Sequence, residues 1–185
     1  KGESFQFNFH AHLLQRHRNS SRPVRLEYTE RVIKETLRLF PPVPLTGRQV
    51  HRDTELASYK VPAGTTLLLN LFGAHRDPAH WPDPLAFDPD RFLAERSRGR
   101  HPCAFLPFSG GARNCMGLQY AMMNMKTFLA TVLRELRVER ADDPYTDIHQ
   151  LPLYADLSLR IVGGARVVFA RRPTRETEVG SQTTS

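Results

Sequence analysis

The chain has 185 residues, of which 40% are hydrophobic, enough to bury one or two modest cores of a globular protein. Its 26 Lys and Arg residues exceed its 19 Asp and Glu residues, giving a formal net charge of +7, but the basic residues are dispersed and form no nucleic-acid-binding motif. The two cysteines, Cys103 and Cys115, are too few for a disulfide framework and form no Cys-x-x-Cys pair, so reduced, intracellular surroundings are expected.

Residues 1–25 match no motif and stay unassigned. Three phenylalanines alternate between positions 5 and 9, which is the pattern of a short strand. The histidines at positions 10, 12 and 17 have no carboxylate or thiol companions at ligand spacing. We therefore interpret them as solvated surface residues rather than as a metal site.

A helix is predicted over residues 26–40, because Val32, Ile33 and Leu37 recur on one face and the prolines that follow end it. Glu35 and Arg38 are three residues apart on this helix and therefore neighbours. An exposed pair of this kind would contribute only about 0.2–0.5 kcal/mol, so on its own a solvated ion pair is the plainer interpretation.

Strands are predicted over residues 48–50 and 55–70, with Pro62-Ala63-Gly64 turning the second stretch into a hairpin. The stretch 75–84 is too rich in proline for a regular element, and we expect it to wrap around the molecule. Its packing should come from three aromatic residues, Trp81, Phe87 and Phe92.

One thiol, Cys115, lies between glycines just before a long apolar-periodic stretch, in the sequence Phe108-Ser109-Gly110-Gly111-Ala112-Arg113-Asn114-Cys115-Met116-Gly117. At the start of a helix, unpaired main-chain N–H groups and the positive end of the helix dipole can stabilise a thiolate. Gly111 and Gly117 permit the close approach of a flat macrocycle, and Arg113 can pair with a carboxylate at its edge. A lone cysteine is more often a small buried hydrophobe, so this interpretation needs support from the rest of the chain.

A core helix is predicted after Cys115, from an apolar stripe at helical spacing. The stripe consists of Leu118, Ala121, Met122, Met125, Phe128, Leu129, Val132, Leu133 and Leu136. Residues 157–171 alternate around Gly163-Gly164 and predict a two-residue hairpin. Residues 174–185 are polar and aperiodic, which predicts a disordered tail.

Three separate motifs occur in the order in which one enzyme family has them. The Phe-x-x-Gly-x-Arg-x-Cys-x-Gly spacing around Cys115 resembles the haem-binding signature of the cytochrome P-450 family of haem-thiolate monooxygenases, with every defined position matched. Glu35-Thr36-Leu37-Arg38 resembles its Glu-x-x-Arg helix, and Phe87-Asp88-Pro89-Asp90-Arg91-Phe92 resembles its meander motif. The stretch from Pro41 to Arg48 is similar as well, whereas Asn124 stands where many members have Glu.

The resemblance implies a mainly α fold with small β-sheets, in which residues 26–173 form the carboxyl-terminal part of a cytochrome P-450 domain. It implies that the cofactor is haem b, iron protoporphyrin IX, with the thiolate of Cys115 as the ligand of its iron. The other implied cofactor-binding residues are Arg113, Arg48, Phe108, Gly111 and Gly117, with both arginines on the propionates.

Two further groups of residues follow from the resemblance. A buried charge network that holds the cysteine loop would consist of Glu35, Arg38 and Arg91. The residues that face the substrate would be Val43, Pro44 and Leu45.

The activity implied is the insertion of one oxygen atom from O2 into an apolar substrate such as a fatty acid or another lipid, since the sequence around Glu35 is most similar to the microsomal fatty-acid-hydroxylase branch. Electrons would come from NADPH through a flavoprotein reductase, whose acidic surface could face Lys126 and Arg134. The parent protein would lie on the cytoplasmic face of the endoplasmic reticulum membrane, although this chain has no apolar run long enough for an anchor.

The family's distal helix, which carries an acid-alcohol pair for proton delivery, has no counterpart in the 185 residues. We therefore expect a carboxyl-terminal fragment that retains haem weakly or not at all and has no monooxygenase turnover. Two alternatives remain open. One is a noncatalytic haem-binding or dimerising regulator, and the other is an inactive, poorly folded truncated isoform.

Overall fold

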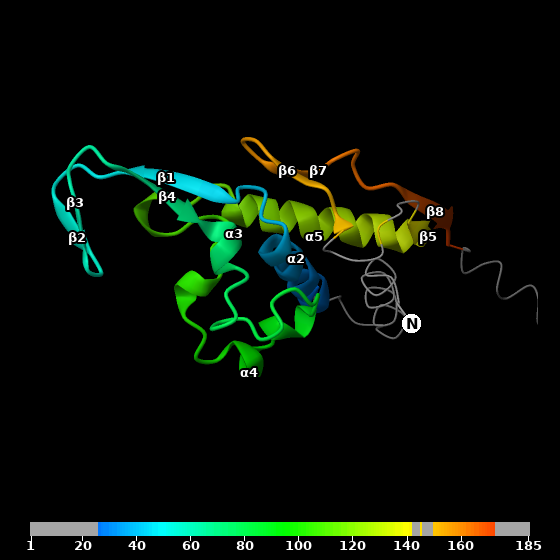
Figure 1. Ribbon diagram of the computed structural model, residues 1–185. Coiled ribbons are helices and arrows are strands. Elements are labelled where there is room, and N and C mark those ends of the chain that lie inside the picture. Colours follow the sequence, from blue (N-terminus) through cyan, green and yellow to red (C-terminus); the bar gives the residue numbers. More distant parts are fainter. Residues whose placement is uncertain (1–25, 142–144, 146–149, 173–185) are drawn as a thin grey trace, which may run out of the picture.

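The computed structural model describes residues 26–141, 145 and 150–172. Two long helices, α2 (Glu27–Leu39) and α5 (Leu118–Glu135), pack against each other at the centre of this part. Two-stranded antiparallel sheets surround them (Figure 1), so the expected combination of helices with small sheets is confirmed. The predictions for residues 1–25 and 174–185 lie outside the described residues.

Each sheet in the described part pairs two strands. The pairs are β1 (Leu45–Gln49) with β4 (Thr66–Asn70), β2 (Thr54–Leu56) with β3 (Tyr59–Val61), β5 (Leu136–Ala141) with β8 (Val167–Arg171), and β6 (Leu153–Ala155) with β7 (Leu159–Ile161). Short helical elements connect them: α3 (Leu71–Ala74), η1 (Pro89–Phe92), α4 (Ala94–Ser97), η2 (Pro102–Ala104) and η3 (Gly111–Arg113). The β1–β4 sheet lies near the start of α5 and the β5–β8 sheet lies at its end (Figure 1).

The helix predicted over residues 26–40 is confirmed as α2. It ends at Leu39 because Pro41, two residues later, has no amide hydrogen to continue the helix and restricts the residue before it. Its inward face supplies most of the buried apolar side chains of the described part other than prolines. These side chains are Val32, Ile33, Leu37, Leu39, Leu71, Trp81 and Ala104.

The irregular stretch after α3 is organised around Trp81, whose side chain is 0% exposed. Its indole Nε1 donates a hydrogen bond of 3.2 Å to the carbonyl oxygen of Ala104. The ring centroid of Trp81 lies 5.8 Å from that of Phe92 and 6.2 Å from that of Phe105. The buried indole N–H is satisfied and its ring is packed, so Trp81 anchors this stretch, whose regular elements are short helical turns.

The prediction that the strands on either side of Pro62-Ala63-Gly64 pair with each other is wrong. The chain does turn there, with Gly64 at φ +85°, a conformation that favours glycine. However, β3 pairs with β2 across the turn at Ala57, and β4 returns to pair with β1. The turn at Ala57 (φ +52°) contains neither Gly nor Asn, so the usual sequence signal of a tight hairpin is missing there.

The hairpin predicted around Gly163-Gly164 is also wrong. Both glycines have positive φ, +80° and +73°, and they turn the chain, but the strands on either side do not pair with each other. Instead β7 pairs with β6, and β8 pairs with β5 at the end of α5. Arg172 supports this long-range pairing, because its main-chain N–H donates to the Glu135 carbonyl at 2.9 Å and its Nε donates to the Leu133 carbonyl at 2.7 Å.

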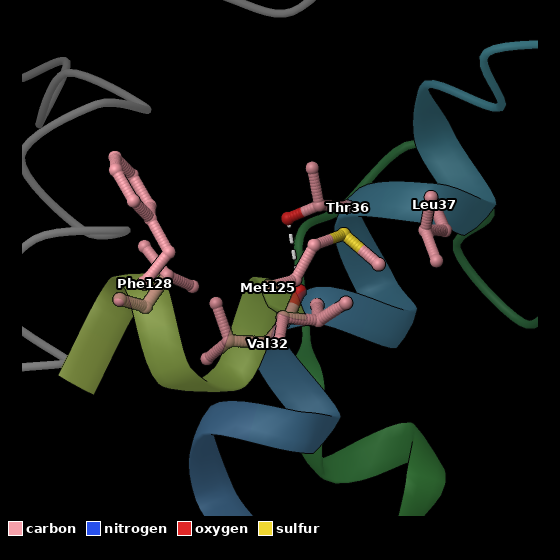
Figure 2. A pocket seen from close by; sticks show the side chains of 7 residues that line it. Val32, Thr36, Leu37, Met125 and Phe128 are labelled. Atoms are coloured by element: carbon pink, nitrogen blue, oxygen red, sulfur yellow. Dashed lines mark hydrogen bonds between the residues drawn. The ribbon is translucent and has the colours of Figure 1, made fainter. Parts of the chain in front are cut away.

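The core helix predicted after Cys115 forms as α5, but none of its residues is fully buried. Phe128, on the predicted apolar stripe, is 63% exposed. A cavity of about 260 Å³ lies between α2 and α5, and Figure 2 shows Phe128 and Met125 on one side of it and Val32 on the other. Packing against α2 therefore covers only part of the stripe.

Candidate functional site

The loop that carries Cys115 connects η2 to α5 and is shaped by its own main chain. The Cys115 N–H donates to the Phe108 carbonyl at 2.9 Å, and the Asn114 N–H donates to the Gly111 carbonyl at 3.1 Å. Gly111 has a φ of +74°, which explains the need for glycine at this position. The thiol of Cys115 is exposed at the surface of this loop.

Two of the predicted loop glycines differ in what they do. Gly111 sits in open space, where a Cβ would meet no atom, so its positive φ is the constraint. A Cβ at Gly117 would lie 3.7 Å from Cys115 Sγ, which places this glycine beside the sulfur. A side chain at Gly117 would crowd any group bound to that sulfur.

Arg48 reaches the cysteine loop from β1. Its Nη2 donates to Ser109 Oγ at 3.1 Å, and its Nη1 donates to Thr46 Oγ1 at 3.0 Å and to the Gly47 carbonyl at 2.8 Å. Ser109 has a φ of +62°, a conformation that non-glycine residues rarely adopt and that is often found at functional sites. The structure therefore brings Arg48 together with the loop that carries Cys115.

The remaining predicted loop residues are Phe108 and Arg113. Phe108 is half-buried and is tied to Cys115 through its carbonyl group. Arg113 is the last residue of η3 and its side chain is exposed.

The expectation that main-chain N–H groups point at the sulfur is not met. No hydrogen bond to Cys115 Sγ forms among residues 26–141, 145 and 150–172, because α5 starts only at Leu118 and the Cys115 N–H is used by Phe108.

Glu35 and Arg38 form a fully buried ion pair instead of the solvated one that their spacing alone would favour. Arg38 Nε lies 2.7 Å from Glu35 Oε2, and Arg38 Nη2 lies 2.8 Å from Glu35 Oε1. The same guanidinium also donates to the carbonyl groups of His75 (2.9 Å), Pro84 (2.6 Å) and Ala86 (3.1 Å). This planar, two-point pairing is the strong form of an Arg–carboxylate contact.

Arg91 completes the network from η1. Its Nε lies 3.3 Å from Glu35 Oε1, and its guanidinium donates to the carbonyl groups of Pro82 and Asp83. Glu35 Oε1 also accepts the Asp88 N–H at 2.9 Å. The structure therefore brings the three predicted network residues together, and they tie α2 to the stretch that precedes the cysteine loop.

Two residues of this region carried no functional prediction. His75 is 0% exposed and its Nε2 accepts the Leu106 N–H at 2.8 Å. Arg100 stacks on Trp81, with its Cζ 4.1 Å from the ring centroid, and donates to the Arg91 carbonyl at 3.0 Å. No spacing rule marks such contacts, because each joins residues that are distant in the sequence.

The three residues predicted to face the substrate differ in their solvent exposure. Val43 and Leu45 are 46% and 49% exposed, whereas Pro44 is buried. The Pro44 carbonyl accepts the Phe72 N–H at 3.0 Å, so this proline packs β1 against α3. Val43 and Leu45 are the members of this group with surface available to a ligand.

Lys126 and Arg134, expected to face a reductase, differ in their availability. Lys126 Nζ lies 2.6 Å from Glu30 Oε2, in an ion pair that joins α5 to α2. Hydrogen bonds from Lys126 and from Lys34 lower the pKa of Glu30. Lys126 thus has a structural partner within the chain, whereas Arg134 is exposed beside Glu135.

The described ranges hold no cluster of three or more His, Cys, Asp or Glu side chains suited to a metal ion. Nor does any helix in those ranges combine the length and apolar character needed to cross a membrane.

Comparisons with known proteins identify the family. The family model described as Cytochrome P450 matches residues 11–160. Rat cytochrome P450 4V2 is 45% identical over 159 residues, which are 83% of this chain and 30% of the relative. Cytochrome P450 4g1 of Drosophila melanogaster is 44% identical over 149 residues, which are 80% of this chain and 26% of the relative.

Solved structures give the same result. A crystal structure of a cytochrome P450 (CYP102L1) matches with a TM-score of 0.70 and 30% identity over 80% of this chain and 32% of that chain. The heme domain of cytochrome P450DA matches with a TM-score of 0.69 and 26% identity over 89% of this chain and 40% of that chain. The chain belongs to the cytochrome P450 family, with relatives in its family 4, and spans about a third or less of the length of those curated relatives.

Proposed function

We propose that this chain is the thiolate-bearing part of a haem-thiolate monooxygenase, with Cys115 as the iron ligand. The observation that carries the proposal is the cysteine loop itself. Its exposed thiol lies beside Gly117, its course depends on the positive φ of Gly111, and Arg48 is hydrogen-bonded to its Ser109.

The residues present fit a haem. A soft thiolate is a known ligand for haem iron, and an exposed sulfur with no hydrogen-bonded partner in the described residues is free to bind it. Gly117 leaves space beside the sulfur for a flat macrocycle, since a Cβ there would lie 3.7 Å from Cys115 Sγ. Arg48 and Arg113 are suited to the two propionates, because guanidinium and carboxylate groups match in shape and charge.

The chain's own residues would bind and orient the cofactor. Bound haem would supply the oxygen-activating chemistry, to which a thiolate ligand contributes electron density. Phe108, half-buried behind the loop, would keep water from the sulfur. Glu35, Arg38 and Arg91 would act as a rigid support, since they are buried and fix the stretch that precedes the cysteine loop.

The finer features of the function rest on the family 4 relatives. We infer an apolar substrate such as a fatty acid, with Val43 and Leu45 in contact with it, and electrons from NADPH through a flavoprotein reductase. Arg134 is the exposed basic residue on α5 that such a partner could contact. The parent protein would lie at the endoplasmic reticulum membrane, facing the cytoplasm.

A chimaera tests this function. Residues 26–172 of this chain would replace the matching carboxyl-terminal part of rat cytochrome P450 4V2, and NADPH-dependent hydroxylation of a fatty acid would be measured with a purified reductase. We expect hydroxylation by the chimaera and none after Cys115→Ser. A chimaera that folds and binds haem but hydroxylates equally well with Cys115→Ser would exclude the proposal.

A second candidate function is a noncatalytic haem-binding regulator. The half-buried helix α5, with Phe128 63% exposed, favours it for the isolated chain, because such a surface is suited to a protein partner. Haem bound in a one-to-one ratio with no NADPH-dependent product from the chimaera would support this alternative.

A further inference from the structure

His75 is a buried titratable residue that joins two parts of the molecule. Its main-chain carbonyl accepts from Arg38 Nη1 at 2.9 Å, so it belongs to the buried ion-pair network. Its side-chain Nε2 accepts the Leu106 N–H at 2.8 Å, and the ring lies 5.4 Å from the Phe105 ring. One residue thus contacts both the network and the segment that enters the cysteine loop.

Leu106 connects His75 to the cysteine loop. Its carbonyl accepts the Ser109 N–H at 3.1 Å, and its Cδ2 would lie 3.0 Å from a Cβ built on Gly110. Ser109 in turn is the residue that Arg48 holds, and Phe108 accepts the Cys115 N–H. A continuous set of contacts therefore runs from His75 to the residue that bears the thiol.

We propose that His75 is a positioning residue of the cysteine loop. Its Nε2 accepts the Leu106 N–H and thereby fixes the position of the loop relative to the Glu35–Arg38 network. The acceptor requires a neutral ring, because a protonated imidazole has a donor on both nitrogens. The proton of the neutral ring is assigned to Nδ1, which is buried without a hydrogen bond of normal geometry.

The surroundings of His75 favour the neutral form. Burial lowers the pKa of His75 to about 4. Interaction of the ring with the main chain of Arg38 and Leu37 opposes this shift, and the positive charges of Arg38 and Arg76 add to it. Arg38 faces the ring from α2, and Arg76 follows it in the chain. The segment 104–106, which packs on the ring, contributes no charged group.

Amide hydrogen exchange in the 185-residue chain tests the proposal without any cofactor. His75→Leu removes the acceptor, and His75→Gln keeps an oxygen acceptor that cannot titrate. We expect exchange at Leu106 and in the loop to rise about three- to tenfold in the Leu variant, as for the loss of one buried hydrogen bond. The Gln variant should stay within about twofold of the wild type, and amides at the centre of α2 should not change.

Equal loop exchange in the wild type, His75→Leu and His75→Gln would overturn the proposal. If His75→Leu unfolds, the pH dependence of the wild type tests the proposal instead. Loop exchange, corrected for the intrinsic effect of pH, should rise in the wild type as the pH falls from 6 to 4. It should not rise in His75→Gln. An equal rise in both would also overturn it.

The role toward a haem rests on the proposed function and has its own readout. With added haemin, His75→Leu should lower the fraction of ferrous–carbon monoxide complex that shows the thiolate spectrum, and His75→Gln should restore it. A wild type that never shows this spectrum contradicts the proposed function, while the exchange result still decides the role of His75.

Discussion

Arg48 and Ser109 are 61 residues apart in the sequence, yet Arg48 Nη2 donates to Ser109 Oγ at 3.1 Å. This contact attaches β1 to the loop that carries Cys115. It also places a guanidinium group next to a residue in the left-handed region, at φ +62°. The family resemblance predicted a propionate-binding role for Arg48, and the structure supplies the contact that would hold it in position.

Replacing Arg48 tests that role. Arg48→Gln removes the charge, and we expect it to weaken haemin binding by about tenfold, as for the loss of a charge-assisted hydrogen bond. Ser109→Ala removes only the contact within the chain and should weaken binding less. Arg52→Gln, at an exposed arginine three residues past β1, serves as the matched control and should leave the affinity unchanged. Absorbance titration measures all four proteins, and equal affinities throughout would contradict the role.

The buried network should dominate the stability of the chain. Glu35→Gln leaves Arg38 and Arg91 buried beside a neutral side chain, which should lower the free energy of unfolding by about 3–5 kcal/mol. Urea denaturation measures this change. Glu139→Gln breaks the exposed pair with Arg137 and should change stability by less than about 1 kcal/mol. Similar small effects of both substitutions would show that the network is not rigidly buried.

Stability should fall in acid because His75 is held neutral. Its pKa is lowered to about 4, from an ordinary value near 6.5, so the unfolded chain binds more protons between these two pH values. The contribution of His75 to the free energy of unfolding is fully present above pH 6.5. Between pH 6.5 and pH 4 it falls by about 1.4 kcal/mol per pH unit, and below pH 4 it no longer changes. Comparing the free energy of unfolding at pH 7 and pH 5 in the wild type and in His75→Gln isolates this contribution. If the free energy of unfolding changes equally with pH in both proteins, groups other than His75 cause the change.

The centre of the core should lie on α2 rather than on α5. Leu39 is 0% exposed, so Leu39→Ala should cost about 2–5 kcal/mol. Leu129 lines the cavity between the two helices and is half-buried, so Leu129→Ala should cost about 1 kcal/mol. Equal costs in urea denaturation would mean that α5 is covered in solution.

The local elements were predictable from sequence where the signal was local. The apolar face and the terminating prolines marked α2, and the stripe marked α5. The strand partners were not predictable in the same way, since β4 pairs with β1 and β8 with β5 over long distances. The chain does turn at Gly64 and at Gly163-Gly164, as predicted. The strands on either side of each turn pair with strands elsewhere in the chain and not with each other.

The site shows the same division. The spacing around Cys115 indicated the loop, and Glu35 and Arg38 were recognisable as a motif. Burial turned that motif from a weak exposed pair into a bidentate one with three further carbonyl acceptors, which spacing alone cannot show. His75 and Arg100 were missed because their contacts, to Leu106 and to Trp81, form only when the irregular stretch folds around the tryptophan.

The chain has two exposed cysteines, which allows a matched test of the iron ligand. Excess haemin would be added to the wild type, to Cys115→Ser and to Cys103→Ser, and the absorbance of each reduced carbon monoxide complex would be recorded. We expect weak binding by the isolated chain, with the Soret band of thiolate ligation in the wild type and in Cys103→Ser and its loss in Cys115→Ser. The same thiolate band in Cys115→Ser would contradict the assignment of Cys115 as the ligand.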